Sequence, residues 1–228
     1  WFLSSWFCFK EDEDMLFYNH DTNVRLNADY SLKYRRNLGA TAYDINSSTT
    51  LSTSTWYHIV FTFSTINGMT LYINGSSEGT NSYTGNASSH SSDYGLMYRA
   101  DNGGQRTKGK IDQVRIFSSA LTSSQVSTLY AETAATVESL DPLNVDTTDT
   151  LQVLGDSSCI ATYRFENDEV DLSGNYDATG TEIQYAAGRY GQAAVFNGSS
   201  SYIDWEGNVG NNNFALSAWV YLSSYNST

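Results

Sequence analysis

Alternating apolar and polar residues predict β-strands over most of this chain. The clearest runs are 56–63, 69–73 and 109–117 in the front part, and 159–165, 192–196, 201–205 and 214–222 in the back part. Asn-Gly pairs at 67–68 and 74–75 suit turn positions with positive φ, so the first two runs are expected to form a hairpin. In 109–117, Ile111 and Val114 fall on opposite sides of a regular strand. Apolar residues on both sides indicate an inner strand rather than an edge.

One helix stands out among the strands. Thr122-Ser123-Ser124-Gln125 has the spacing of a capping box, and apolar residues follow at Val126, Leu129 and Tyr130. We expect this helix to pack across an end of the sheets. The next residues are rich in Ala, Thr, Asp and Glu and contain the only proline, Pro142. Residues 134–158 are interpreted as a linker or extended arm, with an ordered structural insert as the alternative.

Composition narrows the class of protein. The 228 residues carry 12 Lys+Arg against 25 Asp+Glu, a net charge of −13, which disfavours nucleic acid and anionic membrane surfaces as partners. No apolar run approaches the roughly 18 residues of a spanning helix, so no membrane insertion is expected, and no secretory leader is expected at the start. Two cysteines allow at most one bridge, Cys8 to Cys159. Abundant Ser, Thr, Asn and Tyr with few Lys favour an extracellular or virion-surface β protein.

Several segments together resemble the laminin-G-like modules of the concanavalin-A-like lectin superfamily. The resemblance implies an all-β fold, a concanavalin-A-like jelly-roll sandwich of two antiparallel sheets with one short helix. The segments that carry it are Ala161–Phe165, Asp171-x-Ser173-Gly174-Asn175, Gly191–Gly198, Phe214–Val220, Trp56–Val60, Leu71–Gly75, and Ile111–Phe117 with the helix after it.

The order of these segments departs from the family. Residues 1–133 resemble the C-terminal half of a module and 159–228 the N-terminal half, so the resemblance implies that 159–228 complements 1–133 in the same or a neighbouring chain. Either half alone would expose sheet edges and an apolar face. We therefore predict that the segments around Leu3–Lys10 and Phe214–Leu222 are strands of one sandwich. A tandem array, a circular permutant and donor-strand exchange are the alternatives. Residues 2–6 also resemble residues 215–219, which would make the two segments equivalent strands of two modules.

An acidic loop after residue 165 offers oxygen ligands. Asp171 and Asn175 on a glycine turn suit a hard cation such as Ca²⁺, which takes 6–8 oxygens. By resemblance to the family, Asp112 is a further candidate ligand. The alternative is an Asx-turn that only shapes the loop.

The same loop bears on catalysis. Glu166-x-Asp168-x-x-Asp171 is similar to the Glu-x-Asp-x-x-Glu strand of retaining glucanases, whose two carboxylates lie about 5–5.5 Å apart. Here the third carboxylate is one methylene shorter and the cluster follows a strand instead of lying within it. A solvated or metal-binding loop is therefore expected, and no enzymatic activity.

Tyrosines, amides and glycines between residues 83 and 104 are candidate ligand contacts. Sugars are bound by aromatic faces together with planar polar groups, and residues on loops can supply both. Ordinary β-turns use the same residue types. Trp205, near Asn and Gly turns, is the tryptophan expected at the surface. The candidate ligand-binding residues are Tyr83, Tyr94, Tyr98, Asp101 and Asn102.

Two functions are compatible with these features. The first is a non-enzymatic extracellular or virion-surface module for recognition and adhesion that binds glycans or a partner protein, with Ca²⁺ as a candidate cofactor. The second is a structural repeat of a fibre or virion decoration, assembled by strand exchange as a tandem array or a head-to-tail homo-oligomer.

Overall fold

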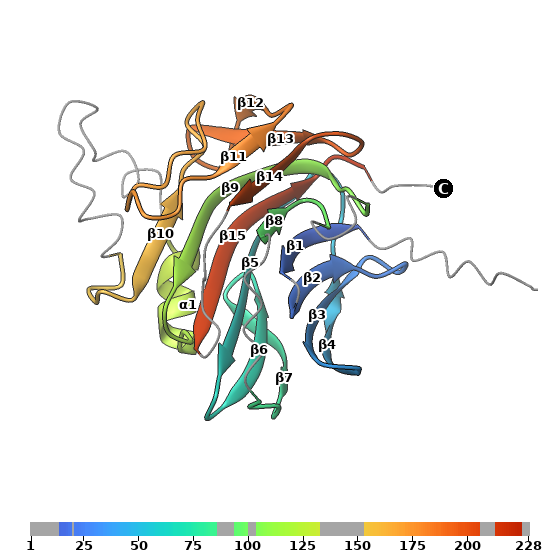
Figure 1. Ribbon diagram of the computed structural model, residues 1–228, viewed down its shortest axis with the longest axis vertical. Helices are drawn as coiled ribbons and strands as arrows, with labels where there is room; N and C mark the ends of the chain where they lie inside the picture. Colours follow the sequence, from blue (N-terminus) through green and yellow to red (C-terminus); the bar gives the residue numbers. More distant parts are fainter. Residues whose placement is uncertain are drawn as a thin grey trace, which may run out of the picture.

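Two antiparallel β-sheets form the molecule (Figure 1). The computed structural model describes residues 14–19, 21–85, 94–99, 104–132, 153–205 and 213–224. The seven-stranded sheet has the order β11-β14-β8-β1-β2-β3-β4, and its strands are β1 (Met15–Asn19), β2 (Thr22–Leu26), β3 (Ser31–Leu38), β4 (Thr41–Thr50), β8 (Tyr94–Leu96), β11 (Thr179–Thr181) and β14 (Tyr202–Trp205).

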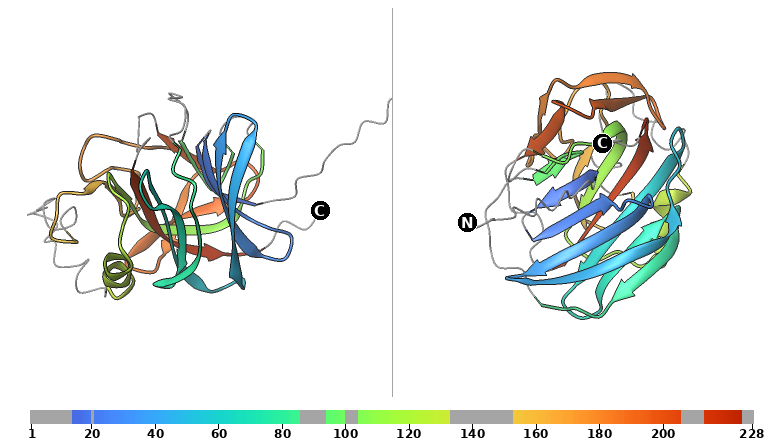
Figure 2. Two further views of the ribbon diagram at one scale, coloured as in Figure 1. Left: turned by 90° about the horizontal axis from the view of Figure 1, so that it is seen from below. Right: turned by 90° about the vertical axis from the view of Figure 1, so that its right-hand side faces the viewer.

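The eight-stranded sheet has the order β12-β13-β9-β15-β5-β6-β7, with β10 paired to β9. Its strands are β5 (Trp56–Ser64), β6 (Gly68–Ile73), β7 (Ser76–Asn81), β9 (Lys108–Phe117), β10 (Cys159–Tyr163), β12 (Gln184–Ala187), β13 (Gln192–Asn197) and β15 (Phe214–Leu222). The predicted all-β class, with two antiparallel sheets, is confirmed, and the two sheets lie face to face as in a jelly-roll sandwich (Figure 2).

Strands from the front and back parts of the chain share both sheets. In the seven-stranded sheet β14 pairs with β8, and in the eight-stranded sheet β15 lies between β5 and β9. Leu216 of β15 is opposite both Phe61 and Ile116. Phe214–Leu222 is therefore a central strand of the sandwich, whereas Leu3–Lys10 lies outside the described residues. The family module to which each part corresponds stays a prediction.

The core fills the space between the sheets. Phe17 and Phe61 meet there from opposite sheets, with ring centroids 5.0 Å apart. Trp205 also lies there, 3% exposed, with its ring stacked on Tyr94 at 5.3 Å. The expectation that Trp205 is at the surface is wrong, because alternation along β14 turns Ile203 and Trp205 inward.

A bulge in β9 changes which residues face the core. Gln113 has φ +50°, and the register of β9 with β15 shifts at this point. Ile111 and Val114 consequently lie in the same core, although a regular strand would place them on opposite sides. The inner position predicted for this strand is confirmed, since β9 lies between β13 and β15.

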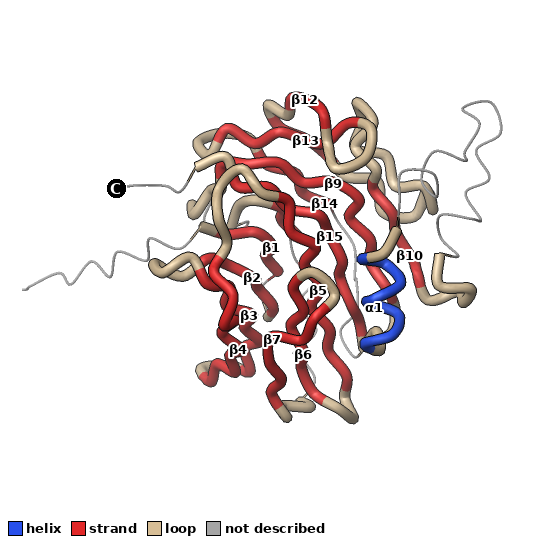
Figure 3. The backbone as a smooth tube through the Cα atoms, turned by 180° about the vertical axis from the view of Figure 1, so that it is seen from behind, coloured by secondary structure: helices blue, strands red, loops and turns tan. Residues whose placement is uncertain are grey.

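The predicted helix is α1 (Ser123–Tyr130), which is the only helix in the part of the chain described (Figure 3). Its capping box is complete: the Thr122 hydroxyl accepts from Gln125 N at 3.3 Å, and the Gln125 side chain accepts from Thr122 N at 2.9 Å. Val126 and Leu129 pack on Phe117 and its neighbours, on the outer face of the eight-stranded sheet. An apolar outer patch on that sheet, not an end of the sandwich, is what the helix covers. No helix among these residues is long and apolar enough to cross a membrane.

Candidate functional site

Asp171 holds together the loop between β10 and β11. Its Oδ1 accepts hydrogen bonds from Thr162 N (2.8 Å) and Ser173 N (3.1 Å). Its Oδ2 accepts from Asn175 N (3.3 Å), Tyr176 N (3.1 Å) and the Ser173 hydroxyl. Asp171 is buried, while Asn175 is exposed. All five donors belong to the protein, so the carboxylate acts as the centre of an Asx-type turn.

This geometry fits a calcium ion poorly. A cation at Asp171 would have to displace hydrogen-bond donors from both oxygens, and Ca²⁺ needs several more oxygen ligands. The described residues contain no group of three or more metal-ligating side chains. Asp112 lies on β9, where its carboxylate accepts from Tyr190 N (2.9 Å) and Gln113 Nε2 (3.2 Å). None of the described hydrogen bonds joins Asp112 to the Asp171 loop, so Ca²⁺ binding by these three residues stays a prediction.

The carboxylates of the glucanase-like spacing have separate partners. Glu166 Oε2 accepts from Gln192 N at 3.1 Å, and Asp168 is exposed and accepts from Val170 N at 3.4 Å. Both lie in the loop after β10 and not within a strand. No described contact pairs them as a general acid and a nucleophile would be paired.

The predicted ligand-contact residues occupy different environments. Tyr94 is 3% exposed in the core, so its prediction as a surface contact is corrected: its ring faces inward beside Trp205. Tyr83 is half-buried, and its ring stacks on Tyr43 at 3.8 Å with an interplanar angle of 11°. Tyr98 packs on Tyr202 and is 6% exposed, so most of its ring is covered by neighbouring residues. Asp101 and Asn102 lie outside the described residues.

Tyr98 belongs to a cluster on the outer face of the seven-stranded sheet. Because Ile203 and Trp205 point into the core, Tyr202 points outward, and its ring lies 4.4 Å from that of Tyr98. The Arg106 guanidinium carbon lies 5.2 Å from the Tyr98 ring centroid and 4.9 Å from that of Tyr202, within range of a cation–π interaction.

Glycine makes room for this cluster. A Cβ at Gly95 would lie 2.6 Å from Cε1 of Tyr98, so the tyrosine ring can approach the sheet only at a residue without a side chain. Tyr18 is the partner of Gly95 in β1, and the Arg99 guanidinium carbon lies 5.8 Å from its ring centroid. Asn23 is opposite Tyr18 in β2, and its Oδ1 has no hydrogen-bond partner in the described part of the chain.

These residues form what we call the tyrosine–arginine face: Tyr18, Asn23, Tyr98, Arg99, Arg106 and Tyr202. Sequence reasoning found only Tyr98 among them. Alternation within 202–205 predicts that Tyr202 faces away from Trp205, but which strand lies beside it depends on pairing between residues more than one hundred positions apart.

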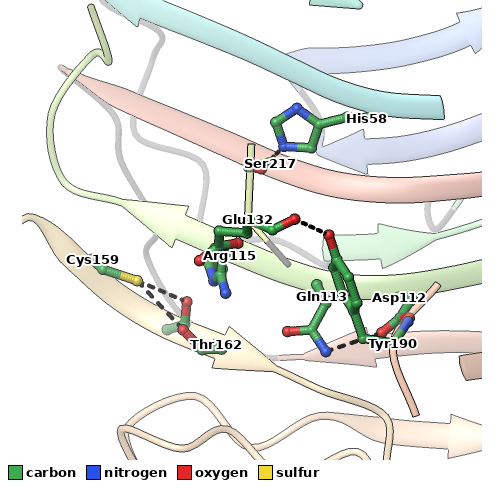
Figure 4. Close-up of polar contacts among 10 residues, drawn as sticks. His58, Asp112, Gln113, Arg115, Glu132, Cys159, Thr162, Tyr190 and Ser217 are labelled. Carbon is green, nitrogen blue, oxygen red and sulfur yellow. Dashed lines mark hydrogen bonds and ion pairs between the residues drawn. The ribbon is translucent and has the colours of Figure 1, made fainter. Parts of the chain in front are cut away.

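A second polar layer lies between the eight-stranded sheet and the segment after α1 (Figure 4). Arg115 Nη1 pairs with Glu132 Oε2 at 2.5 Å, and the Tyr190 hydroxyl donates to the Glu132 carbonyl at 2.6 Å. His58 Nε2 is 2.8 Å from Ser217 Oγ, and burial lowers the pKa of His58 to about 3. Since His58 is neutral, buried and has no carboxylate on Nδ1 among the described residues, it lacks the features of a catalytic base. Through the contacts of Glu132 with Arg115 and Tyr190, this layer holds the residues after α1 against the sheet.

Double-sheet jelly rolls occur in lectin domains, among other proteins. A family model described as the concanavalin A-like lectin/glucanases superfamily matches residues 3–127, and the chain belongs to this superfamily. The resemblance seen in the sequence is thereby confirmed. We found no match among curated proteins or among solved structures. Membership indicates a carbohydrate- or protein-binding module. The matched segment ends before β10, although β10 to β15 complete both sheets.

Proposed function

We propose that this protein is a non-enzymatic recognition and adhesion module, extracellular or on a virion surface, that binds a glycan through the tyrosine–arginine face. The observation that carries the proposal is the meeting of Tyr98, Tyr202 and Arg106 on the outside of the seven-stranded sheet. The part-exposed ring of Tyr202 offers an apolar surface with a polar edge, and the guanidinium of Arg106 offers planar donors, which together suit a sugar ring and its hydroxyls. Nη1 of Arg106 donates to the carbonyls of Ser200 and Ser201 at 3.2 and 3.4 Å, which fixes the guanidinium beside the two tyrosines. A partner protein presenting similar polar groups is the alternative ligand.

Binding is favoured over catalysis by the arrangement of the acids. Glu166 and Asp168 hold backbone amides of different segments, and neither has a described contact with the tyrosine–arginine face. Glycoside hydrolysis requires two carboxylates that flank one bond.

A glycan array followed by calorimetry tests the proposal. We expect Tyr202→Leu to weaken binding of an array hit about tenfold or more, the effect of roughly 1.4 kcal/mol from a lost aromatic contact. Tyr130→Leu is the matched control, because Tyr130 is a half-exposed tyrosine that stacks on Trp219 at the other sheet. Equal binding by wild type and Tyr202→Leu, or an array without hits, would contradict the proposal.

A structural function is the second candidate, and one observation favours it. β15 comes from the back part of the chain and lies at the centre of the eight-stranded sheet. Its two neighbours there, β5 and β9, come from the front part. The same pairing made between chains would build a head-to-tail assembly. Light scattering over a hundredfold range of concentration tests this function: growth in mass together with a silent glycan array supports it, and a constant monomer mass contradicts it.

A further inference from the structure

Two consecutive arginines of β3 lie on opposite faces of the seven-stranded sheet. Arg35 is on the outer face, where Nε and Nη2 donate to the two carboxylate oxygens of Asp44, each at 2.7 Å. These two nitrogens form one edge of the guanidinium, and their parallel N–H groups match the two oxygens of a carboxylate. Arg35 therefore shows how a filled arginine edge looks in this protein.

Arg36 is on the inner face and is 1% exposed. Its Nη1 donates to Thr22 Oγ1 at 2.8 Å, and its guanidinium carbon lies 3.8 Å from the ring centroid of Phe63 and 5.2 Å from that of Phe214. Within the described part of the chain, Nε and Nη2 have no hydrogen-bond partner. The edge that Arg35 uses for Asp44 is thus empty in Arg36.

An empty edge at this depth is unfavourable. A buried charge is stable only when its hydrogen-bonding groups are paired, and a guanidinium does not neutralise itself by losing a proton under ordinary conditions. Burial lowers the pKa of Arg36, which reflects this cost. Tyr34, Tyr83 and Asp21 oppose this shift electrostatically, and a side-chain hydrogen bond with Tyr34 adds to their effect, but none of them bonds to Nε or Nη2. The Tyr83 hydroxyl is also buried without a described partner and interacts electrostatically with Arg36. Nε and Nη2 of Arg36 and the Tyr83 hydroxyl therefore all lack a hydrogen-bond partner among the described residues.

We propose that Nε and Nη2 of Arg36 bind the carboxylate group of a small-molecule ligand, with the Tyr83 hydroxyl as a further donor. Because Phe63 covers a face of the guanidinium, the ligand must approach in the plane of the group, which suits a planar carboxylate. A monoanion also places less negative charge near the buried Asp21 than a dianion would. This site is on the inner side of β3 and is separate from the tyrosine–arginine face.

Acetate is the probe for this site. We expect sodium acetate to raise the melting temperature of the wild-type protein above that in sodium chloride of equal ionic strength, with a saturable dependence on concentration and a shift of several degrees at saturation. Acetamide, which has the same shape without the charge, should give no shift. Arg36→Lys keeps a charge but loses the edge, so it should abolish the difference between acetate and chloride. Arg35→Lys is the matched control on the same strand and should keep it.

A second measurement needs no substitution. In the wild-type protein, the Nε–Hε resonance of Arg36 should move on addition of acetate and reach a plateau at the concentration that saturates the thermal shift, while that of Arg35 stays in place. Equal melting temperatures in acetate and chloride, or an Arg36 resonance that acetate does not move, would overturn the proposal, whether or not Arg36→Lys folds.

The thermal shifts in glucuronate and in glucose distinguish a carboxylate that is part of a sugar from one that is not. A shift in glucuronate alone supports the site and assigns it to a sugar acid. A shift in acetate without one in glucuronate supports the site and assigns it to a carboxylate not borne by a sugar. Tyr202→Leu should leave the acetate response intact, so failure of the proposed glycan function is distinguishable from failure of the carboxylate site.

Discussion

Asp112 and His58 are buried ionisable groups whose pKa values move in opposite directions. Asp112 is 0% exposed, and burial raises its pKa from 3.8 to about 7. His58 is 2% exposed, and burial lowers its pKa from 6.5 to about 3. Both shifts favour the neutral form in the folded protein. The free energy of unfolding should therefore depend on pH through both groups, with opposite signs.

The folded state binds a proton at Asp112 more tightly than the unfolded state does. Asp112 thus contributes stability that is complete below pH 3.8 and is lost as the pH rises through about 7. The folded state binds a proton at His58 more weakly, so His58 contributes stability that is present above pH 6.5 and is lost as the pH falls toward about 3. From pH 8 to pH 5, Asp112 should add about 3 kcal/mol and His58 should remove about 2 kcal/mol.

These two contributions nearly cancel in the wild type and separate in variants. Asp112→Asn keeps an oxygen that accepts the hydrogen bond from Tyr190 N. Its new amide group can donate to Gln113 Oε1, which has no hydrogen-bond partner among the described residues. In urea unfolding at pH 8 and pH 5, the free energy of unfolding of the wild type should differ by about 1 kcal/mol or less. That of Asp112→Asn should fall by about 2 kcal/mol on acidification. His58→Gln should gain about 3 kcal/mol over the same range. Asp168→Asn, the same change on an exposed loop, is the control. Identical pH dependence of wild type and Asp112→Asn would refute the reasoning.

Three further predictions concern single contacts. Asp171→Ala should lower the free energy of unfolding by about 3 kcal/mol or more, because it leaves several buried donors unpaired. Calorimetric melting should show the same loss of stability with and without a chelator. A wild-type melting temperature that falls with chelator would instead indicate a metal at this loop. Glu132→Leu should lower the free energy of unfolding in urea by about 3–5 kcal/mol, because it leaves buried Arg115 without its ion-pair partner. Adding Arg115→Met to the same chain should restore most of this stability. A loss below about 1 kcal/mol for Glu132→Leu would contradict the buried pair. Burial raises the pKa of the free Cys159 thiol, so a thiol reagent should modify Cys159 only after unfolding, as peptide mass spectrometry would show; modification of the native protein at the rate of a free thiol would argue against that environment.

Local features of this fold were predictable from the sequence. The hairpin of β5 and β6 follows from alternation and from the turn residues before Met69. The turn itself is residues 65–67, so Ser64 is opposite Gly68 and Phe63 is opposite Met69. The helix begins where the capping box places it, at Ser123 after Thr122. In each case the residues that determine the structure lie within a few positions of one another, so their spacing carries the information.

Features that depend on contacts between distant strands were not predictable in the same way. The bulge at Gln113 puts Ile111 and Val114 on one side of β9, and no local residue type signals it. Trp205 and Tyr94 look like surface aromatics beside Asn and Gly, yet they stack on each other because β14 pairs with β8. The acidic loop follows β10, as the sequence predicts. The spacing of Asp171 and Asn175 does not reveal that backbone N–H groups donate to the Asp171 carboxylate.

The pairing of β14 with β8 links the two proposed functions physically. Tyr98 follows β8 in the front part of the chain, and Tyr202 begins β14 in the back part, so the tyrosine–arginine face exists only where the two parts share a sheet. The same joining places β15 between β5 and β9, which would otherwise present unpaired edges next to an exposed core. If the joining occurs within a chain, a monomer carries a complete face. If it occurs between chains, each junction of the assembly creates one face, and glycan binding must then increase with assembly. Measuring binding per mole of chain against assembly mass therefore distinguishes a permuted module from a strand-exchanged fibre.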